Sequence, residues 1–219
     1  SQDVIMLMLH ASSLGLPYLP VKLMEGSDLE YKWGISAEIR KTIPKLPDKK
    51  LERIPNPFKE GEDVIAVPVP RLDTAIISVQ KASINGTCSI EGDEFHDIDV
   101  AIAARKVIVL AEEIVSEEEI RRDPAKNSIP QFCVDAVVHV PYGTHPSQLY
   151  NYYDYDADFY KMYDKVTKTD EDFEKFIQEW VIDVKDHEGY LAKLGLPRVS
   201  KLKVVPGFQY AAKLVKDGE

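Results

Sequence analysis

Short apolar runs rich in β-branched residues alternate with polar stretches from residue 64 onward. Four of these runs are bounded by prolines or polar turns: Val64 to Val69, Thr74 to Gln80, Lys106 to Ile114 and Cys133 to Val140. Continuous apolar runs of this length are typical of strands that are covered on both faces. A further strand is expected at Leu202 to Val205, followed by a frayed tail. The pattern therefore predicts a buried sheet.

Helical patterns and capping residues fill most of the segments between these runs. The first predicted helix is capped by Ser1 and Asp3 and ends at Gly15, and a second covers Asp97 to Arg105. A short helix begins at a capping box on Ser116. Three more helices are expected at roughly 157 to 165, 169 to 184 and 186 to 194. Because apolar strands alternate with helices, we expect a layered α/β fold. Its open sheet should be largely parallel and covered by helices.

Prolines interrupt the front of the chain. Pro17 and Pro20 forbid a helix across residues 16 to 29, which we interpret as a loop. Residues 30 to 62 are polar and proline-rich, and predict a long surface excursion with one short helix near Ser36 to Thr42.

Length and charge limit the classes of protein to consider. A chain of 219 residues suits a single domain over 1–219, with the excursion at 30–62 and a helical C-terminal part at 157–194. The formal net charge is -10, from 37 acidic and 27 basic residues. Because an acidic chain repels phosphate backbones, the balance argues against a general nucleic-acid binder.

The cysteines and the hydropathy pattern bear on the compartment. Cys88 and Cys133 each lie in an apolar run, and neither a disulfide framework nor a zinc-binding spacing is present. We therefore expect buried, reduced thiols in a cytoplasmic protein. The sequence has no run of about 18 apolar residues, so it predicts no membrane-spanning helix.

Candidate chemistry gathers where predicted strands end, since ligands of open α/β sheets bind at the carboxyl ends of strands. Glu112 and Glu113 follow one apolar run, and can face a cleft or form a solvated turn. The PYGTHPS segment at 141–147 is either a functional loop or a tight turn. QKASINGT at 80–87 is either a polar binding loop or an Asn-Gly hairpin.

The other motifs in the sequence say less about function. FHDID at 95–99 resembles a metal site, but it is explained more simply as a polar helix start. Nucleotide-binding, nucleophile-elbow and zinc-protease motifs do not occur in the sequence. The residues alone therefore indicate an α/β protein with a polar cleft and no complete catalytic set.

Long stretches of the chain resemble the alpha (A) subunits of the glutaconate CoA-transferases, a group of family I CoA-transferases. The resemblance is carried by SQDVIMLMLHASSLGLPYLPVKLMEGS, NPFKEGEDVIAVPVPRLDTAI, EEIVSEEEIRRDPAKNSIP, CVDAVVHVPYGTHPSQLYNYYDYD and DKVTKTDEDFEKFIQEWVIDVKDHEGYLAKLG. Subunits of this kind begin with a further segment that has a glycine-rich turn. The resemblance thus implies that this chain corresponds to the C-terminal two-thirds of an alpha subunit.

The resemblance also implies a reaction and a partner. Enzymes of this group move CoA between acetyl-CoA and a dicarboxylate such as glutaconate or 2-hydroxyglutarate. A glutamate on the partner, the beta (B) subunit, forms a glutamyl-CoA thioester, so no catalytic nucleophile is expected in this chain. Coenzyme A is then a substrate, no bound cofactor or metal is implied, and the assembly is a hetero-oligomer of alpha–beta pairs.

Four residues are candidates for substrate binding by the same resemblance. Gln2 lies in the SQD stretch, which faces the acyl site in related proteins, and Gln80 and Ser83 leave the central sheet toward that site. His145 belongs near the wall of the cleft. The tyrosines of residues 142–155 are then expected to form a packing seam, either between subunits or between the sheet and the C-terminal helices.

Two alternatives remain open at this level. A hydrolase or ring-opening enzyme of the same superfamily has a similar alpha subunit, which can contribute its own glutamate. This chain has Gln2 at the comparable position, which favours the transferase. A non-catalytic interaction module is the second alternative.

Overall fold

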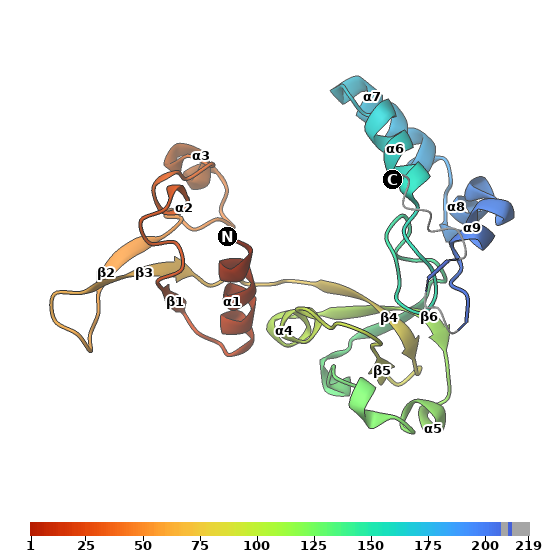
Figure 1. The fold of residues 1–219 in the computed structure, drawn as a ribbon, viewed down its shortest axis with the longest axis horizontal. Coiled ribbons are helices and arrows are strands. Elements are labelled where there is room, and N and C mark those ends of the chain that lie inside the picture. Colours follow the sequence, from red (N-terminus) through yellow and green to blue (C-terminus); the bar gives the residue numbers. More distant parts are fainter. Residues whose placement is uncertain (207–209, 212–219) are drawn as a thin grey trace. The chain divides into compact units, whose positions relative to one another are not determined.

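The computed structural model describes residues 1–206, 210 and 211, which Figure 1 shows as a ribbon. The chain divides into two compact units. Unit 1 comprises Ser1–Ala75 and Glu94–Val107, and unit 2 comprises Ile76–Asp93 and Ile108–Glu219. The organisation of 1–219 as a single domain stays a prediction.

Unit 1 contains a three-stranded antiparallel sheet. Its strands are β1 (Tyr18–Val21), β2 (Glu52–Pro55) and β3 (Asp63–Pro68), in the order β1-β3-β2. Interpreting residues 16 to 29 as a loop was wrong for β1. Pro20 forbids a helix but fits an edge strand, where a missing N–H leaves no central ladder unpaired. β2 was also missed, because it is short and polar.

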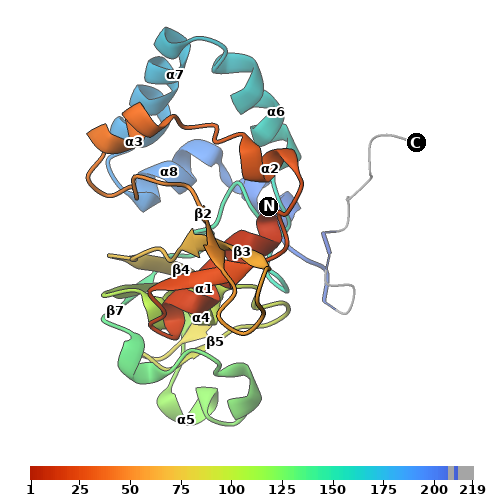
Figure 2. The same ribbon diagram turned by 90° about the vertical axis from the view of Figure 1, so that its left-hand side faces the viewer.

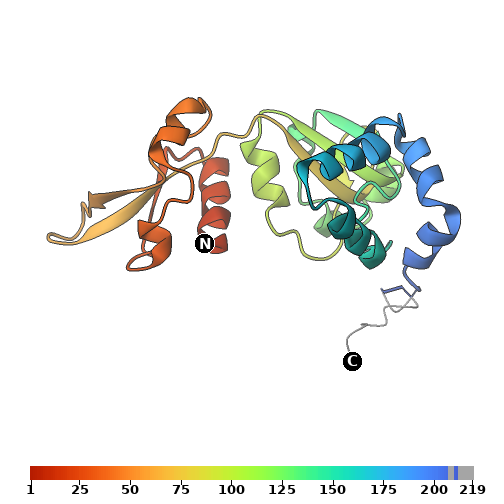
Figure 3. The same ribbon diagram turned by 90° about the horizontal axis from the view of Figure 1, so that it is seen from above.

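The helices of unit 1 agree better with the sequence pattern. They are α1 (Gln2–Ser13), α2 (Asp28–Tyr31), α3 (Ala37–Thr42) and α4 (Asp97–Ala103). The Ser1 hydroxyl accepts a hydrogen bond from the N–H of Val4 and begins α1, as expected. Helices α1 and α4 lie side by side (Figure 3), and the carboxylate of Asp99 on α4 accepts a bond from the hydroxyl of Ser13 on α1.

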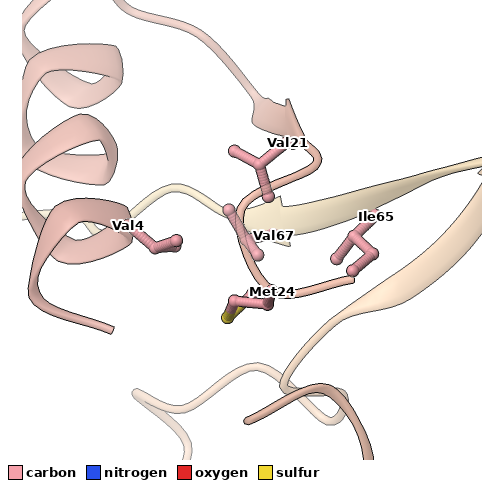
Figure 4. Close-up of a cluster of buried hydrophobic side chains, with 5 residues drawn as sticks. All are labelled: Val4, Val21, Met24, Ile65 and Val67. Atoms are coloured by element: carbon pink, nitrogen blue, oxygen red, sulfur yellow. The ribbon is translucent and has the colours of Figure 1, made fainter. Parts of the chain in front are cut away.

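A small apolar core holds unit 1 together. It consists of Val4 from α1, Val21 from β1, Met24, and Ile65 and Val67 from β3, as Figure 4 shows. Each of these side chains is at most 7% exposed. Burying an aliphatic side chain of this size stabilises a fold by about 1.5–3 kcal/mol, so the cluster fixes α1 against the sheet.

Unit 2 is built on a mixed sheet of four strands in the order β5-β4-β6-β7. The strands are β4 (Ala75–Ala82), β5 (Cys88–Ser89), β6 (Val107–Ile114) and β7 (Ala136–His139). β6 and β7 pair in parallel. Backbone hydrogen bonds join Ala75 to Lys106 at the start of β4 and Ala82 to Val115 at its end, so β4 also runs parallel to β6. β5 returns antiparallel after the Asn85-Gly86 turn. The prediction of a layered α/β fold with a largely parallel sheet is therefore confirmed.

Helices cover this sheet. They are α5 (Glu117–Ile120), α6 (Ala157–Val166), α7 (Asp170–Ile177), the π-helical turn η3 (Gln178–Ile182), α8 (His187–Leu194) and α9 (Leu196–Leu202), with short 3₁₀ turns η1 (Pro124–Lys126) and η2 (Gln131–Cys133). In Figures 1 and 2, α5 lies on one side of the four-stranded sheet and α6–α8 lie on the other. Ser116 begins α5 by accepting from the N–H of Glu119, as the capping box predicts.

Two predictions near the C-terminal part were inaccurate. The strand expected at Leu202 to Val205 is instead the end of α9 followed by two isolated bridges, at Lys203 and at Val204. The strand expected at Cys133 to Val140 begins only at Ala136, because η2 occupies the preceding residues. Most of the tail predicted after Val205 lies outside the described residues. Among the residues that the structure describes, no helix is long and apolar enough to cross a membrane.

Candidate functional site

A pocket of about 580 Å³ opens in unit 2 near the carboxyl ends of β6 and β7. We call it the strand-end pocket. Glu112 and Glu113 of β6, Tyr142 after β7, Tyr152, Tyr153 and Lys203 are among its lining residues. The sequence places Glu112, Glu113 and the 141–147 loop at strand ends, and the structure brings them together here. Lys203 was not singled out from the sequence, and Tyr152 was expected only as part of the tyrosine packing seam, since neither belongs to a strand-end pattern.

Glu112 is a strongly perturbed carboxyl group in this pocket. Its residue is 9% exposed, and its Oε2 accepts a hydrogen bond of 2.7 Å from the backbone N–H of Tyr142. Burial raises the pKa of Glu112 to about 7, with the N–H of Tyr142 opposing the shift and the charge of Glu113 adding to it. Glu112 therefore exchanges a proton near neutral pH, which is the range that suits an acid–base group.

The tyrosines around the pocket pack as well as line it. The rings of Tyr142 and Tyr153 are 4.7 Å apart between centroids, and Tyr153 is 1% exposed. The hydroxyl of Tyr153 accepts a bond from the backbone N–H of Thr144, and burial raises its pKa to about 12. For Tyr142 and Tyr153 the expected packing seam is confirmed within unit 2. Tyr150 and Tyr155 remain 41% and 43% exposed.

Gln80 and Ser83 lie at the carboxyl end of β4, but both side chains are held within the chain. Gln80 is 3% exposed; its amide nitrogen donates to the carbonyls of Glu91 and Tyr150, and its amide oxygen accepts from the N–H of Glu91. Ser83 is 1% exposed and donates its hydroxyl to the carboxylate of Glu117. Substrate binding by either residue stays a prediction.

Replacing Gln80 with alanine should lower the free energy of unfolding by about 1–2 kcal/mol, because it leaves the backbone groups of Glu91 and Tyr150 without these partners. The loss stays moderate because Tyr150 is 41% exposed and Glu91 is partly exposed. Chemical denaturation of the variant measures it. Gln131→Ala is the matched control, since this exposed amide makes a single bond to the carbonyl of Asn85. Equal stabilities of the two variants would contradict the structural role of Gln80.

His145 is the centre of a buried polar network. With Asp156, Tyr190 and Arg198 it forms what we call the Asp156 network. His145 Nε2 lies 3.1 Å from an Asp156 oxygen, and His145 Nδ1 lies 2.6 Å from the hydroxyl of Tyr190. Because an ionised carboxylate only accepts, Nε2 carries the proton and Nδ1 accepts from Tyr190. The side chain of His145 is 1% exposed, and burial lowers its pKa.

The charge of Asp156 is balanced by Arg198, which donates from two guanidinium nitrogens. Asp156 also accepts from the N–H of Phe159 and so begins α6. The pKa of Asp156 falls to about 2, because these hydrogen bonds outweigh its burial. Tyr190 and Arg198 were not predicted, since their meeting depends on the packing of α8 and α9 and has no local signal.

The remaining candidates, Gln2, His96 and the two cysteines, lie outside the strand-end pocket and the Asp156 network. Gln2 is the first residue of α1 and is exposed. The FHDID stretch does start a helix, but an aspartate does not occupy its cap: His96 is the N-cap residue of α4 and makes no side-chain capping bond, while Asp97 and Asp99 lie in the first turn. Among the described residues, no group of three or more His, Cys, Asp or Glu side chains is arranged to hold a metal ion. Cys88 is buried and Cys133 is partly buried, and both are free thiols.

Comparison with known proteins places this chain in a family. The family model described as coenzyme A transferase matches residues 1–140. The chain is 60% identical over 217 residues to the A-type subunit of glutaconate CoA-transferase from Acidaminococcus fermentans, covering 99% of this chain and 68% of that protein. The crystal structure of that enzyme superposes with a TM-score of 0.92 over the same shares of the two chains.

More distant relatives have related names. The A-type subunit of 3-oxoadipate CoA-transferase from Pseudomonas knackmussii is 32% identical over 84% of this chain and 59% of its own length. A cholesterol ring-cleaving hydrolase IpdA subunit from Rhodococcus jostii is 29% identical over 81% of this chain and 58% of its own length. With the family model matching more than half of the sequence, the chain belongs to the coenzyme A transferase family.

Proposed function

We propose that this chain is part of the alpha subunit of an enzyme that transfers CoA from acetyl-CoA to a dicarboxylate such as glutaconate or 2-hydroxyglutarate. The observation that carries the proposal is the 60% identity, over nearly the whole chain, to the A-type subunit of a glutaconate CoA-transferase. Such an alpha subunit works with a beta subunit, which is the partner we propose for this chain.

The proposed reaction passes through the carboxylate of a glutamate on the beta subunit. This carboxylate attacks the thioester carbonyl of acetyl-CoA, the C–S bond breaks, and a mixed anhydride and CoA thiolate result. The thiolate then attacks the glutamyl carbonyl, which releases acetate and leaves a glutamyl-CoA thioester. The dicarboxylate reverses both steps, so that glutaconyl-CoA leaves and the glutamate is restored.

Substrate contact by Gln2, Gln80, Ser83 and His145 remains part of this proposal. Of the four, Gln2 is exposed, whereas the other side chains are buried and hydrogen-bonded within the chain. We therefore expect Gln2 to reach the substrate directly, and Gln80, Ser83 and His145 to position the loops around it.

The mass of each subunit after incubation with acetyl-CoA tests the proposal. In the complete alpha–beta enzyme without acceptor, the beta subunit should gain the mass of covalently bound CoA, and adding glutaconate should remove it and yield glutaconyl-CoA. An adduct on the alpha subunit would instead place the nucleophile there, with Glu112 and Glu113 of the strand-end pocket as the first candidates, and would overturn the assignment to the beta subunit.

The same incubation distinguishes the alternatives. A hydrolase, suggested by the 29% identity to a ring-cleaving hydrolase subunit, would consume its CoA ester without any acceptor acid. An interaction module would bind the beta subunit, yet neither adduct nor exchange would appear. Either result would replace the transferase proposal.

A further inference from the structure

A second pocket, of about 810 Å³, lies entirely within unit 1, between the first turns of α1, the segment after α3 and the end of β3. Four cationic side chains line it: Arg40, Lys45, Lys50 and Arg71. Among the described residues that line it, Asp73 is the only acidic one. We call it the basic pocket. A chain with a net charge of -10 thus surrounds this cavity mainly with positive charge.

The partners of these cations differ. Lys45 is paired with Asp73, with 3.1 Å between Nζ and the carboxylate oxygen. Arg40 donates to the carbonyls of Ile35 and Pro47, and Lys50 donates to those of Leu29 and Lys32. Arg40 also lies over the ring of Trp33, 5.9 Å from its centroid. Within the described part of the chain, neither Arg40 nor Lys50 is paired with a carboxylate, so neutral groups hold these two side chains in place.

Arg71 is the cation with the most capacity left. Across residues 1–206, 210 and 211, its guanidinium makes no hydrogen bond, ion pair or aromatic contact, and the residue is exposed. It lies a few residues after the end of β3, so a structured strand fixes the approach of its backbone. A guanidinium presents several donors in one plane, which suits two-point binding of a carboxylate or phosphate.

Part of the lining of the basic pocket is apolar. Val4, Met24 and Val67, which Figure 4 shows in the buried cluster of unit 1, contribute to this lining, together with Ile5 and Met8 of α1. A cavity with an apolar wall and a few charged groups fits a ligand that has both characters. The strand-end pocket differs, since it combines Glu112 and Glu113 with Lys203.

We propose that the basic pocket binds an anionic group carried on an apolar chain, and that Arg71 provides its counter-charge. This inference rests on the proposed function, which offers two sources of that chemistry. One is the phosphate-bearing pantetheine arm of the CoA ester, and the other is the carboxylate of the dicarboxylate. Clustered cations in a cleft attract either one over several ångströms.

The test is steady-state kinetics of the complete alpha–beta enzyme with Arg71→Glu. Its KM should rise roughly ten- to hundredfold for one substrate, which is the effect expected for losing a charge-assisted hydrogen bond. A rise confined to acetyl-CoA identifies the phosphate-bearing arm, and a rise confined to glutaconate identifies the carboxylate. Arg71→Lys keeps the charge and should restore most of the affinity.

Arg122→Glu is the matched control, because it changes the net charge equally at a guanidinium just after α5 that is 73% exposed and paired with the exposed carboxylate of Glu118, four residues earlier. Equal KM values for wild type and Arg71→Glu, or an equal rise in Arg122→Glu, would overturn the inference. If the wild-type enzyme transfers no CoA, the proposed function fails. The pocket is then tested by calorimetric binding of CoA and of glutaconate, and binding that is absent, or unchanged by Arg71→Glu, would exclude it.

Discussion

Asp156→Ala is expected to lower the free energy of unfolding by about 3–5 kcal/mol, the usual cost of removing one partner from a buried ion pair. The substitution removes the acceptor of His145 Nε2, of two Arg198 nitrogens and of the N–H that begins α6. The cost falls at the lower end of this range, because Arg198 is 32% exposed and water can solvate it. Urea denaturation of the complete alpha subunit measures the loss.

Asp186→Ala is the matched control, because Asp186 also begins a helix by accepting a backbone N–H, that of Gly189, but is exposed. It should cost only about 1 kcal/mol, as for an ordinary N-cap. Similar losses in the two variants would show that Asp156 acts as a cap alone.

In the wild type the folded pKa of Asp156, about 2, lies below its ordinary 3.8. Its contribution is therefore present above about pH 4 and is lost as the pH falls toward 2.

Glu112→Gln is expected to stabilise the protein at pH 8 by roughly 2–3 kcal/mol. The folded pKa of Glu112 is raised from 4.5 to about 7, so ionising it in the folded state costs free energy. The amide has no charge to desolvate, and its oxygen can still accept from the N–H of Tyr142. Thermal unfolding of wild type and variant at several pH values measures the gain.

The pH dependence of the wild-type stability explains why this substitution should stabilise the protein. Between pH 4.5 and 7 the folded wild type holds a proton that the unfolded chain has released, so its stability falls as the pH rises through this window. The advantage of Glu112→Gln should therefore vanish below about pH 4.5 and level off above about pH 7. Glu113→Gln is the control, because Glu113 is 51% exposed and its removal should change stability by less than about 0.5 kcal/mol. A pH-independent gain from Glu112→Gln would refute the explanation by burial.

The fold could be predicted best where a single local cause decides the structure. Ser1 and Ser116 indicate helix starts, and the apolar runs at β4 and β6 indicate buried strands, because caps and burial act over a few residues. β1 was missed because a proline is evidence against a helix but says little about an edge strand. The opposite error was made around Lys203, where a strand was predicted that does not form. The β-branched residues after Lys203 suggested the strand, but the packing of the preceding helix α9 decides the structure there.

The candidate site could be predicted only in part, for a related reason. The position of Glu112 at a strand end is predictable, since it follows from where the apolar run stops. That Gln80 and His145 use their hydrogen-bonding groups within the chain itself is not predictable, because Tyr150 and Tyr190 lie 70 and 45 residues away in sequence. Resemblance can suggest which residues surround a substrate, but it does not distinguish contact from support.

The prolines of unit 1 also limit how wide its small sheet can grow. Both outer strands of the β1-β3-β2 sheet carry a residue without an N–H, Pro20 in β1 and Pro55 in β2, and β2 adds the charges of Glu52 and Arg53. An edge that lacks donors and carries charge is a poor template for another strand. Pro20, which obscures β1 in the sequence, and Pro55 at the other edge thus both disfavour edge-to-edge pairing of this unit with another chain.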